Sequence, residues 1–186
     1  MPIPDFDHNN VLPPHLGNPT VRADLSPYCA TTLELVQKYS TSNARIQILR
    51  NFISFRERMT TYNIVNGFQW LDGSFLQNIE QSDGRPPNDL DLVTFYKDLS
   101  ISDQKEILEG FRDFISPDLS KSNYMLDHYG VDYAYSPDVT VEQTRYWLQL
   151  FSHRRVDMVW KGMVRIELNT VDIDTEALEY LNSLES

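Results

Sequence analysis

Cysteine is almost absent from the sequence, since Cys29 is the only one among 186 residues. A single cysteine excludes an internal disulfide and a zinc site built from several cysteines, and it is typical of a reducing compartment. We therefore expect a cytoplasmic protein. The four histidines show no zinc-type spacing with the cysteine or with one another, so we expect no zinc centre.

Long apolar runs are also missing, and basic residues are few. No stretch approaches the ~20 apolar residues that span a bilayer, and the first residues, MPIPDFDHNN, lack the basic head and apolar segment of a secretion signal. We therefore expect no membrane partner and no export. With 16 basic and 27 acidic residues the formal net charge is -11. This charge weakens attraction to nucleic acid, so general DNA binding is not expected.

The apolar content is that of a folded protein, with 41% hydrophobic and 12% aromatic residues. A chain of 186 residues suits one domain with a sizeable core. Helical patterns come first and strands then alternate with helices, which predicts an α/β or α+β fold whose mixed sheet is covered mainly on one face. The expected parts are an extended arm at 1–26, a helical segment at 27–62, the sheet core at 63–170 and a closing helix at 171–186.

The expected arm is rich in proline, because six of the ten prolines fall within residues 1–27. Proline removes backbone donors and fixes an extended path. Apolar residues recur along this segment, so we expect it to lie on the surface of the domain. Ser26-Pro27 is typical of an N-cap followed by the first helical residue, which predicts a helix near 27–39.

Hydrophobic spacing predicts the remaining elements. The strands are expected at 67–72, 90–96, 129–137 and 162–168. The helices are expected from about Ser42 to Tyr62, from Ser102 to a point before Pro117, and at 141–152 and 172–184.

Two aspartates mark the start of the second expected strand, in the segment PPNDLDLVTFY. Side chains at i and i+2 of a strand lie ~7 Å apart and point the same way, so Asp89 and Asp91 should share one face. Carboxylate oxygens suit magnesium, and two ions about 3.5–4 Å apart can be held if a third carboxylate joins. Asp132, flanked by apolar residues on the next expected strand, is the predicted third ligand.

A Gly-Ser turn ends the first expected strand. Gly73 permits close backbone approach, and Ser74 offers a hydroxyl and free amides where a short helix begins, which is a suitable place for phosphate. Basic residues gather between 154 and 165, where they either stabilise phosphoryl charge or balance the acidic carboxyl-terminal segment. Lys161 is the preferred phosphate ligand because it stands at the entrance of a strand.

This series of elements resembles the nucleotidyltransferase superfamily that includes DNA polymerase beta. Its parts are a strand, Gly-Ser, a short helix, a loop, an Asp-Leu-Asp-Leu strand and a later aspartate strand. The segments IPDFDHNNVLPPHLGNPT, PPNDLDLVTF, GVDYAYSP and HRRVDMVWKGMVRIEL are similar to a group of small bacterial nucleotidyltransferase-like proteins without a settled activity. One departure is the gap of fourteen residues between Ser74 and Asp89, which includes the loop SDGRPP and slightly exceeds that family's usual gap.

The resemblance implies a role for each site residue. Gly73 and Ser74 would bind the triphosphate, Asp89 and Asp91 would bind two magnesium ions, and Asp132 would serve the catalytic ion and the incoming hydroxyl. The implied reaction moves a nucleoside monophosphate from ATP or another nucleoside triphosphate to a protein or RNA hydroxyl, and pyrophosphate leaves.

Other interpretations stay open for the same residues. Asp-Gly is a common turn pair, and the Asp-x-Asp pattern also occurs in phosphatases and glycosyltransferases. In both of those classes the acids end an apolar strand, whereas here they precede one, which favours a nucleotidyltransferase. A second function is a catalytically weak or inactive protein of this fold that acts through a partner, as in toxin-antitoxin or phage-defence systems. The apolar residues of the arm and the high acidity motivate it.

Overall fold

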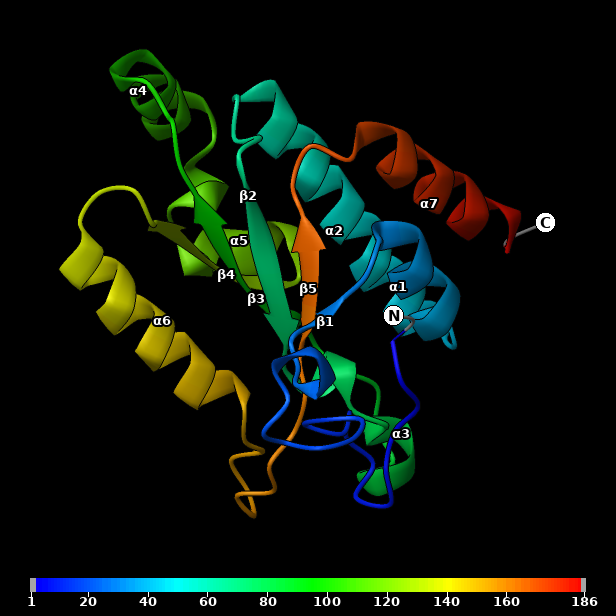
Figure 1. Cartoon of the computed structure of the whole chain (residues 1–186). Coiled ribbons are helices and arrows are strands. Elements are labelled where there is room, and N and C mark those ends of the chain that lie inside the picture. The colour runs from blue at the N-terminus through cyan, green and yellow to red at the C-terminus, as the bar shows by residue number, and fades with distance from the viewer. Residues whose placement is uncertain (1–2, 185–186) are drawn as a thin grey trace.

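The chain folds around a five-stranded mixed sheet with strand order β1-β5-β2-β3-β4. A computed structural model of the protein describes residues 3–184 (Figure 1). The predicted fold, a mixed sheet with accompanying helices, is confirmed. The strands are β1 (Tyr28–Cys29), β2 (Gly67–Asp72), β3 (Leu90–Tyr96), β4 (Leu126–Asp132) and β5 (Val164–Glu167). The helices are α1 (Thr32–Tyr39), α2 (Asn43–Thr61), α3 (Ile79–Ser82), α4 (Ile101–Gly110), α5 (Pro117–Tyr124), α6 (Pro137–Phe151) and α7 (Val171–Ser183).

The strand directions bring four strand ends to one edge of the sheet. β2 runs antiparallel to β3 and to β5, while β3 and β4 are parallel. The end of β2 therefore lies beside the starts of β3, β4 and β5. Along this edge, which we call the acidic edge, Asp72 is opposite Asp91 and Asp91 is opposite Asp127.

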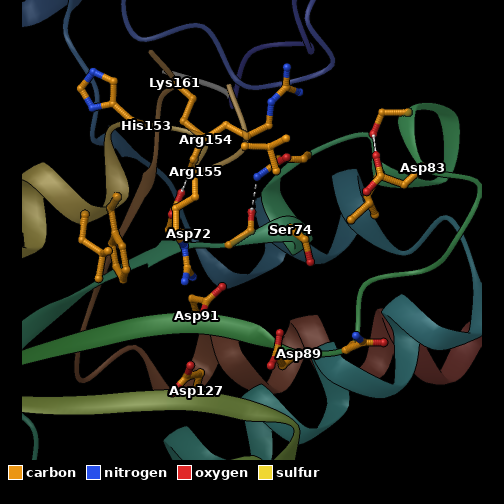
Figure 2. A pocket seen from close by; sticks show the side chains of 18 of the residues that line it. Asp72, Ser74, Asp83, Asp89, Asp91, Asp127, His153, Arg154, Arg155 and Lys161 are labelled. Atoms are coloured by element: carbon orange, nitrogen blue, oxygen red, sulfur yellow. Dashed lines mark hydrogen bonds and ion pairs between the residues drawn. The ribbon is translucent and has the colours of Figure 1, made fainter. Parts of the chain in front are cut away.

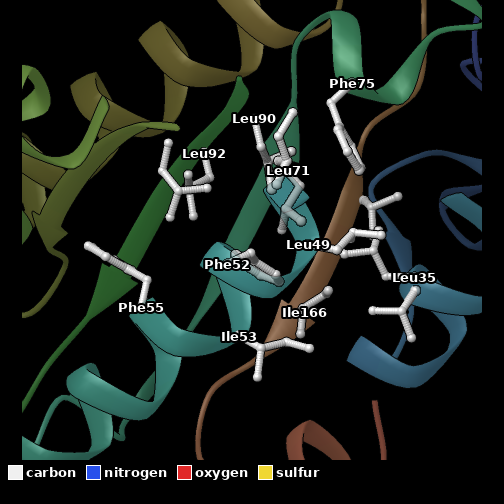
Figure 3. Packing of buried hydrophobic residues seen from close by; sticks show 14 of the residues in the cluster. Leu35, Leu49, Phe52, Ile53, Phe55, Leu71, Phe75, Leu90, Leu92 and Ile166 are labelled. Atoms are coloured by element: carbon white, nitrogen blue, oxygen red, sulfur yellow. The ribbon is translucent and has the colours of Figure 1, made fainter. Parts of the chain in front are cut away.

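The two faces of the sheet are covered unequally. On one face, α1, α2 and α7 pack over the strands with the α4–α5 region, and α6 lies over the other face (Figure 1). Figure 3 shows Phe52 of α2 near Leu71 and Ile166 of the sheet, and all three side chains are buried. The larger core thus lies under α2, which agrees with helices expected mainly on one face.

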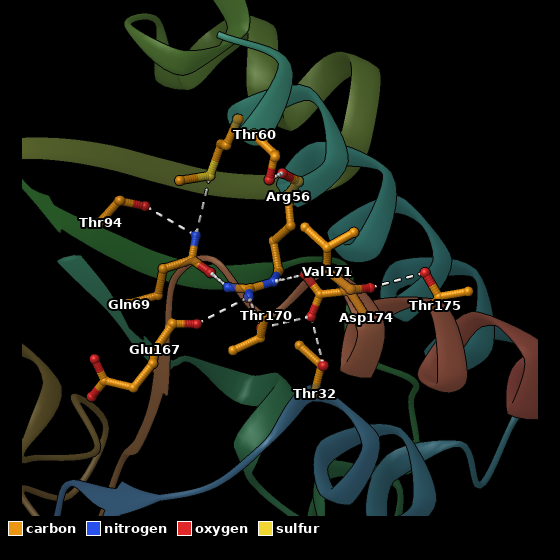
Figure 4. A network of polar contacts seen from close by, with 11 residues as sticks. Thr32, Arg56, Thr60, Gln69, Thr94, Glu167, Thr170, Val171, Asp174 and Thr175 are labelled. Carbon is orange, nitrogen blue, oxygen red and sulfur yellow. Dashed lines mark hydrogen bonds and ion pairs between the residues drawn. The ribbon is translucent and has the colours of Figure 1, made fainter. Parts of the chain in front are cut away.

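A polar network crosses this larger core (Figure 4). Arg56 of α2 donates from Nε to Asp174 Oδ2 of α7 at 2.9 Å and from Nη1 to Gln69 Oε1 of β2 at 2.7 Å. Gln69 Nε2 donates to Thr94 Oγ1 at 3.0 Å, and Thr94 Oγ1 lies 2.9 Å from His128 Nε2. These hydrogen bonds link α2 and α7 to three strands, and they satisfy the buried groups of Arg56 and Gln69.

Several element boundaries differ from the sequence-based expectation. The first helix begins at Thr32, after a capping box formed by Thr31 and Glu34, because Tyr28–Cys29 pairs with β5 instead of entering a helix. The third expected helix ends at Gly110, and Ile115 is exposed. β4 starts at Leu126, three residues before the expected position, since Met125 adopts φ 58° and ends α5 abruptly.

The amino-terminal arm lies on the domain, as expected. Val11 and Leu12 are fully buried. Val11 forms a β-bridge with Gln77, and Gly162 N donates to Leu12 O at 2.8 Å. The arm therefore joins the segment after β2 to the segment before β5.

No helix within residues 3–184 combines the length and the apolar composition that crossing a membrane would require.

Candidate active site

The acidic edge forms the floor of a pocket of about 810 Å³. Asp72, Asp89, Asp91 and Asp127 line it from three strand ends (Figure 2). The convergence follows from the strand directions, because a residue at the end of β2 and residues at the starts of β3 and β4 must meet there.

Asp91 is a strongly perturbed carboxyl group of this floor. Burial raises its pKa from the ordinary 3.8 to about 7, and the neighbouring charges of Asp89, Asp72 and Asp127 add to the rise, while Arg155 opposes it. Like charges at short range disfavour a further negative charge. Within residues 3–184, no ion pair of Asp91 is observed. The pocket thus concentrates negative charge that a bound cation would relieve.

The third acid of the site is Asp127, and the expectation that Asp132 faces Asp89 and Asp91 is wrong. Asp132 is the last residue of β4 and pairs with Tyr96 at the far end of β3. Its carboxylate accepts a hydrogen bond from Ala134 N at 2.9 Å, and its charge acts on Tyr96. The cause of the error is the strand boundary: β4 begins at Leu126, so its second residue lies beside Asp91.

Gly73 stands directly against the Asp91 carboxylate, whereas the expected approach of phosphate to its backbone stays a prediction. Its φ is 85°, and a Cβ at this position would lie 1.8 Å from Asp91 Oδ2. Glycine is therefore required both for the backbone conformation and for the space. Ser74 follows in a short 3-10 helix, Ser74–Leu76, and its side chain lines the pocket (Figure 2).

Arg45 of α2 holds the segment after the Gly-Ser turn. It is 2% exposed, and it donates to Phe75 O at 2.6 Å and to Gln77 O at 2.7 Å. It also forms a two-point ion pair with Glu80 at 2.6 and 2.9 Å. The planar guanidinium can satisfy all these acceptors at once.

Lys161 lies at the acidic edge, but its ammonium is not directed to open pocket. Lys161 and Asp72 are both buried and form an ion pair. Burial raises the pKa of Asp72, and the Lys161 charge opposes that rise. Sequence reasoning expected Lys161 to bind phosphate directly. Its position instead makes it the counter-ion of Asp72.

Arg155 is the basic side chain whose place best suits a phosphate. Figure 2 shows it between Asp72 and Asp91. Its charge opposes the rise that burial causes in the pKa of both carboxyl groups. Among the described residues that line the pocket, every other Lys or Arg has an ion pair. These pairs are Arg85–Asp83, Lys121–Asp89, Arg154–Asp157 and Lys161–Asp72.

Lys121 also contacts the acids of the pocket floor. It comes from the last turn of α5, and its Nζ lies 2.7 Å from Asp89 Oδ2 and 3.9 Å from Asp127 Oδ2. Its side chain is 54% exposed. The hydrogen bond to Asp89 raises the pKa of Lys121, and the charges of Asp127 and Asp91 contribute. Sequence reasoning missed this residue, since a lone lysine in KSNY carries no signal.

Aromatic residues of β4 and α6 line the same pocket. Trp147 is buried between Tyr129, with ring centroids 4.9 Å apart, and Tyr146, at 5.0 Å. Tyr129 is two residues from Asp127 on β4, so both side chains leave the strand on the same face. The pocket therefore has an acidic floor, an aromatic border and a basic loop, which carries Arg154 and Arg155.

A preformed metal cage is not observed in the described part of the chain. Within residues 3–184, no three His, Cys, Asp or Glu side chains are placed to hold a metal ion by themselves. Magnesium often takes one or two protein carboxylates and completes its shell with substrate phosphates and water. The acidic edge offers carboxylates of that kind.

A protein-family profile described as a family of unknown function (DUF6932) matches residues 4–167, so the chain belongs to this family. Neither the curated proteins nor the solved structures gave a match.

Proposed function

We propose that this member of the DUF6932 family is a metal-dependent nucleotidyltransferase. It would transfer a nucleoside monophosphate from a nucleoside triphosphate to a protein or RNA hydroxyl. The observation that carries the proposal is the meeting of Asp91, Asp127 and the Gly73-Ser74 turn at one edge of the sheet. Clustered acids alone fit several reactions. Acids beside a glycine-containing turn and Arg155, which has no ion pair among the described residues, fit a cation-bound polyphosphate.

The residues present fit magnesium. The floor supplies hard oxygen donors, and the raised pKa of Asp91 reflects burial together with uncompensated negative charge that a divalent cation would neutralise. Asp89, Asp91 and Asp127 would hold the ions together with phosphate oxygens. When bound, magnesium would neutralise the charge that develops on the transferred phosphoryl group.

The basic loop and the turn would place the triphosphate. Arg155 would contact phosphate oxygens, because it is directed toward the acids and has no ion pair within residues 3–184. The Ser74 hydroxyl would contact another phosphate oxygen at the turn. Arg45 would keep the turn in position through the hydrogen bonds that its guanidinium donates to Phe75 O and Gln77 O.

The acceptor would approach beside Asp127. In the proposed reaction the acceptor oxygen bonds to the α-phosphorus, the bond between that phosphorus and the bridging oxygen breaks, and pyrophosphate leaves with that oxygen. Asp127, whose side chain is 26% exposed, would accept the proton of the hydroxyl. Tyr129 and Tyr146 would border the acceptor on this side of the pocket.

Two measurements test the proposal. Calorimetry with non-hydrolysable ATP, GTP, CTP and UTP analogues and Mg²⁺ measures binding, and transfer of label from [α-³²P]NTPs to RNA or protein measures the reaction. We expect Asp91→Asn and Asp127→Asn to reduce transfer at least ~100-fold, in the range seen when a group that stabilises a transition state is removed. Asp132→Asn is the matched control and should stay within ~2-fold of wild type, as expected for a residue outside the site.

Two results would reject the proposal. One is the absence of binding of every analogue with Mg²⁺ present. The other is an equal loss of transfer in Asp127→Asn and Asp132→Asn, because these acids lie at opposite ends of β4. Circular dichroism of each variant separates a lost activity from a lost fold.

A partner-dependent protein of the same fold is the second candidate. Its supporting observation is the exposure of three apolar side chains before β5: Val156 at 94%, Met158 at 68% and Trp160 at 44%. Exposed apolar groups that lie together often contact another protein. Co-purification from the native cell tests it. A complex and a biological effect that both survive Asp91→Asn with Asp127→Asn would favour this candidate over the enzyme.

A further inference from the structure

Lys121 places its positive charge against two acids of the pocket floor. Its ammonium contacts Asp89 at 2.7 Å and lies 3.9 Å from Asp127, so one positive charge serves two of the acids on the floor. Asp72 has Lys161 as its own partner. Within residues 3–184, Lys121 is therefore the ion-pair partner of Asp89 and Asp127, and Asp91 has none.

The contact can be exchanged. The Lys121 side chain is 54% exposed, in contrast to Lys161, which is 3% exposed. An exposed ion pair of this kind contributes little to stability, about 0–1 kcal/mol. A divalent cation brings twice the charge of the ammonium to the same carboxylate oxygens. It can also bind phosphate oxygens as further ligands at the same time.

We infer that Lys121 is a resident counter-ion that a divalent cation must displace from Asp89 and Asp127. This inference rests on the proposed function, because it takes the acids to be the cation site. Lys121 would thus offset part of the charge of Asp89 and Asp127 when no nucleotide is present, and it would weaken binding of the free ion. A cation bound to a triphosphate would displace it more readily, since phosphate oxygens add to the ligands.

The test uses Mn²⁺ as the probe. Free Mn²⁺ is counted by electron paramagnetic resonance at constant ionic strength, with the whole protein and no nucleotide. We expect Lys121→Met to bind Mn²⁺ at least ~5-fold more tightly than wild type, because the competing charge is removed. Lys121→Arg keeps the charge and should not bind more tightly. Lys105→Met, on the exposed side of α4, changes the net charge equally and is the matched control.

Thermal unfolding gives a second readout. Without Mn²⁺, Lys121→Met should unfold at a lower temperature than wild type, because Asp89 and Asp127 lose their counter-ion. Saturating Mn²⁺ should raise its unfolding temperature more than that of wild type or Lys105→Met. If Lys121→Met does not fold, Lys121→Gln takes its place in both measurements.

The outcomes separate the two proposals. Equal or weaker Mn²⁺ binding by Lys121→Met, relative to both wild type and Lys105→Met, overturns the counter-ion role and leaves the nucleotidyltransferase proposal standing. An equal gain in Lys121→Met and Lys105→Met also overturns it, because the effect is then one of net charge. Absence of Mn²⁺ binding by every protein, with and without a non-hydrolysable ATP analogue, rejects the proposed function itself.

Discussion

At the scale of single residues, the four aspartates of the pocket floor differ in their burial and in their nearest charged partner. Asp72 is paired with a buried lysine, Asp89 with an exposed one, and Asp91 is left with neighbouring negative charge. Asp127 shares the lysine of Asp89. The same chemical group therefore takes a structural role at Asp72 and a candidate binding role at the other positions. Burial and the nearest partner decide which role applies.

The raised pKa of Asp91 predicts an unusual dependence of stability on pH. The folded protein holds a proton on Asp91 up to about pH 7, whereas the unfolded chain releases it near 3.8. Between these values the folded state binds more protons, so this group lowers stability as the pH rises. We expect Asp91→Asn to exceed wild type in unfolding free energy at pH 8 by on the order of 2–4 kcal/mol.

Chemical denaturation at pH 8 and pH 4 checks this expectation, in buffer without divalent cations. The difference between Asp91→Asn and wild type should shrink toward pH 4, where the folded wild type is already protonated. Asp132→Asn is the control and should show no comparable gain at pH 8. A variant Asp91→Asn that is less stable than wild type at pH 8 would contradict the assigned environment.

At the scale of elements, the Gly-Ser turn is positioned by a helix far from it in the sequence. Arg45 of α2 binds two carbonyl oxygens of the segment after Gly73 and ion-pairs with Glu80 of α3. The guanidinium supplies hydrogen-bond donors for Phe75 O and Gln77 O, which lie outside the α-helices and the sheet.

Arg45→Met should therefore loosen residues 73–80 while leaving the sheet folded. Unpaired buried carbonyl groups cost about 1–3 kcal/mol each, so we expect a loss of roughly 2–4 kcal/mol in unfolding free energy. Amide hydrogen exchange should accelerate in 73–80 more than in β3. Arg112→Met, which changes an exposed arginine, is the control. Unchanged exchange in 73–80 would show that Arg45 does not hold the turn.

At the scale of the whole molecule, the amino-terminal arm joins two segments that contribute residues to the pocket. Asn78 N donates to Asn10 O at 2.9 Å, and Gly162 N donates to Leu12 O at 2.8 Å. The arm thus contacts both the segment after the Gly-Ser turn and the segment that contains Lys161. Proline makes this possible, because it holds the arm extended without requiring a partner strand.

Leu12→Ala tests whether the arm is part of the folded domain. Leu12 is fully buried, and removing such a side chain costs about 2–5 kcal/mol. Leu16 is 47% exposed, so Leu16→Ala, the matched control, should change unfolding free energy by less than about 0.5 kcal/mol. Urea denaturation measures both variants. A loss below about 1 kcal/mol in Leu12→Ala would show that the arm can leave the surface at little cost.

The sequence predicted what depends on local interactions. The strands at 67–72 and 90–96 and the helix after Ser42 were expected at nearly their observed bounds, because apolar spacing, turn residues and an N-cap act over a few residues. Local patterns also singled out Asp89 and Asp91 as a pair on one strand face and Gly73 as part of a turn. Their meeting at one edge followed from the antiparallel pairing of neighbouring strands.

The tertiary structure alone decided which third acid joins them. Choosing Asp127 over Asp132 requires the register of β4 against β3, and that register is set by a left-handed residue at Met125 and by packing under α5. The ion-pair partners of Lys121, Lys161 and Arg45 could not be predicted either, because charge pairing between distant segments leaves no periodic pattern in the sequence. Local patterns thus determined the elements, and strand register with long-range charge pairing decided the site.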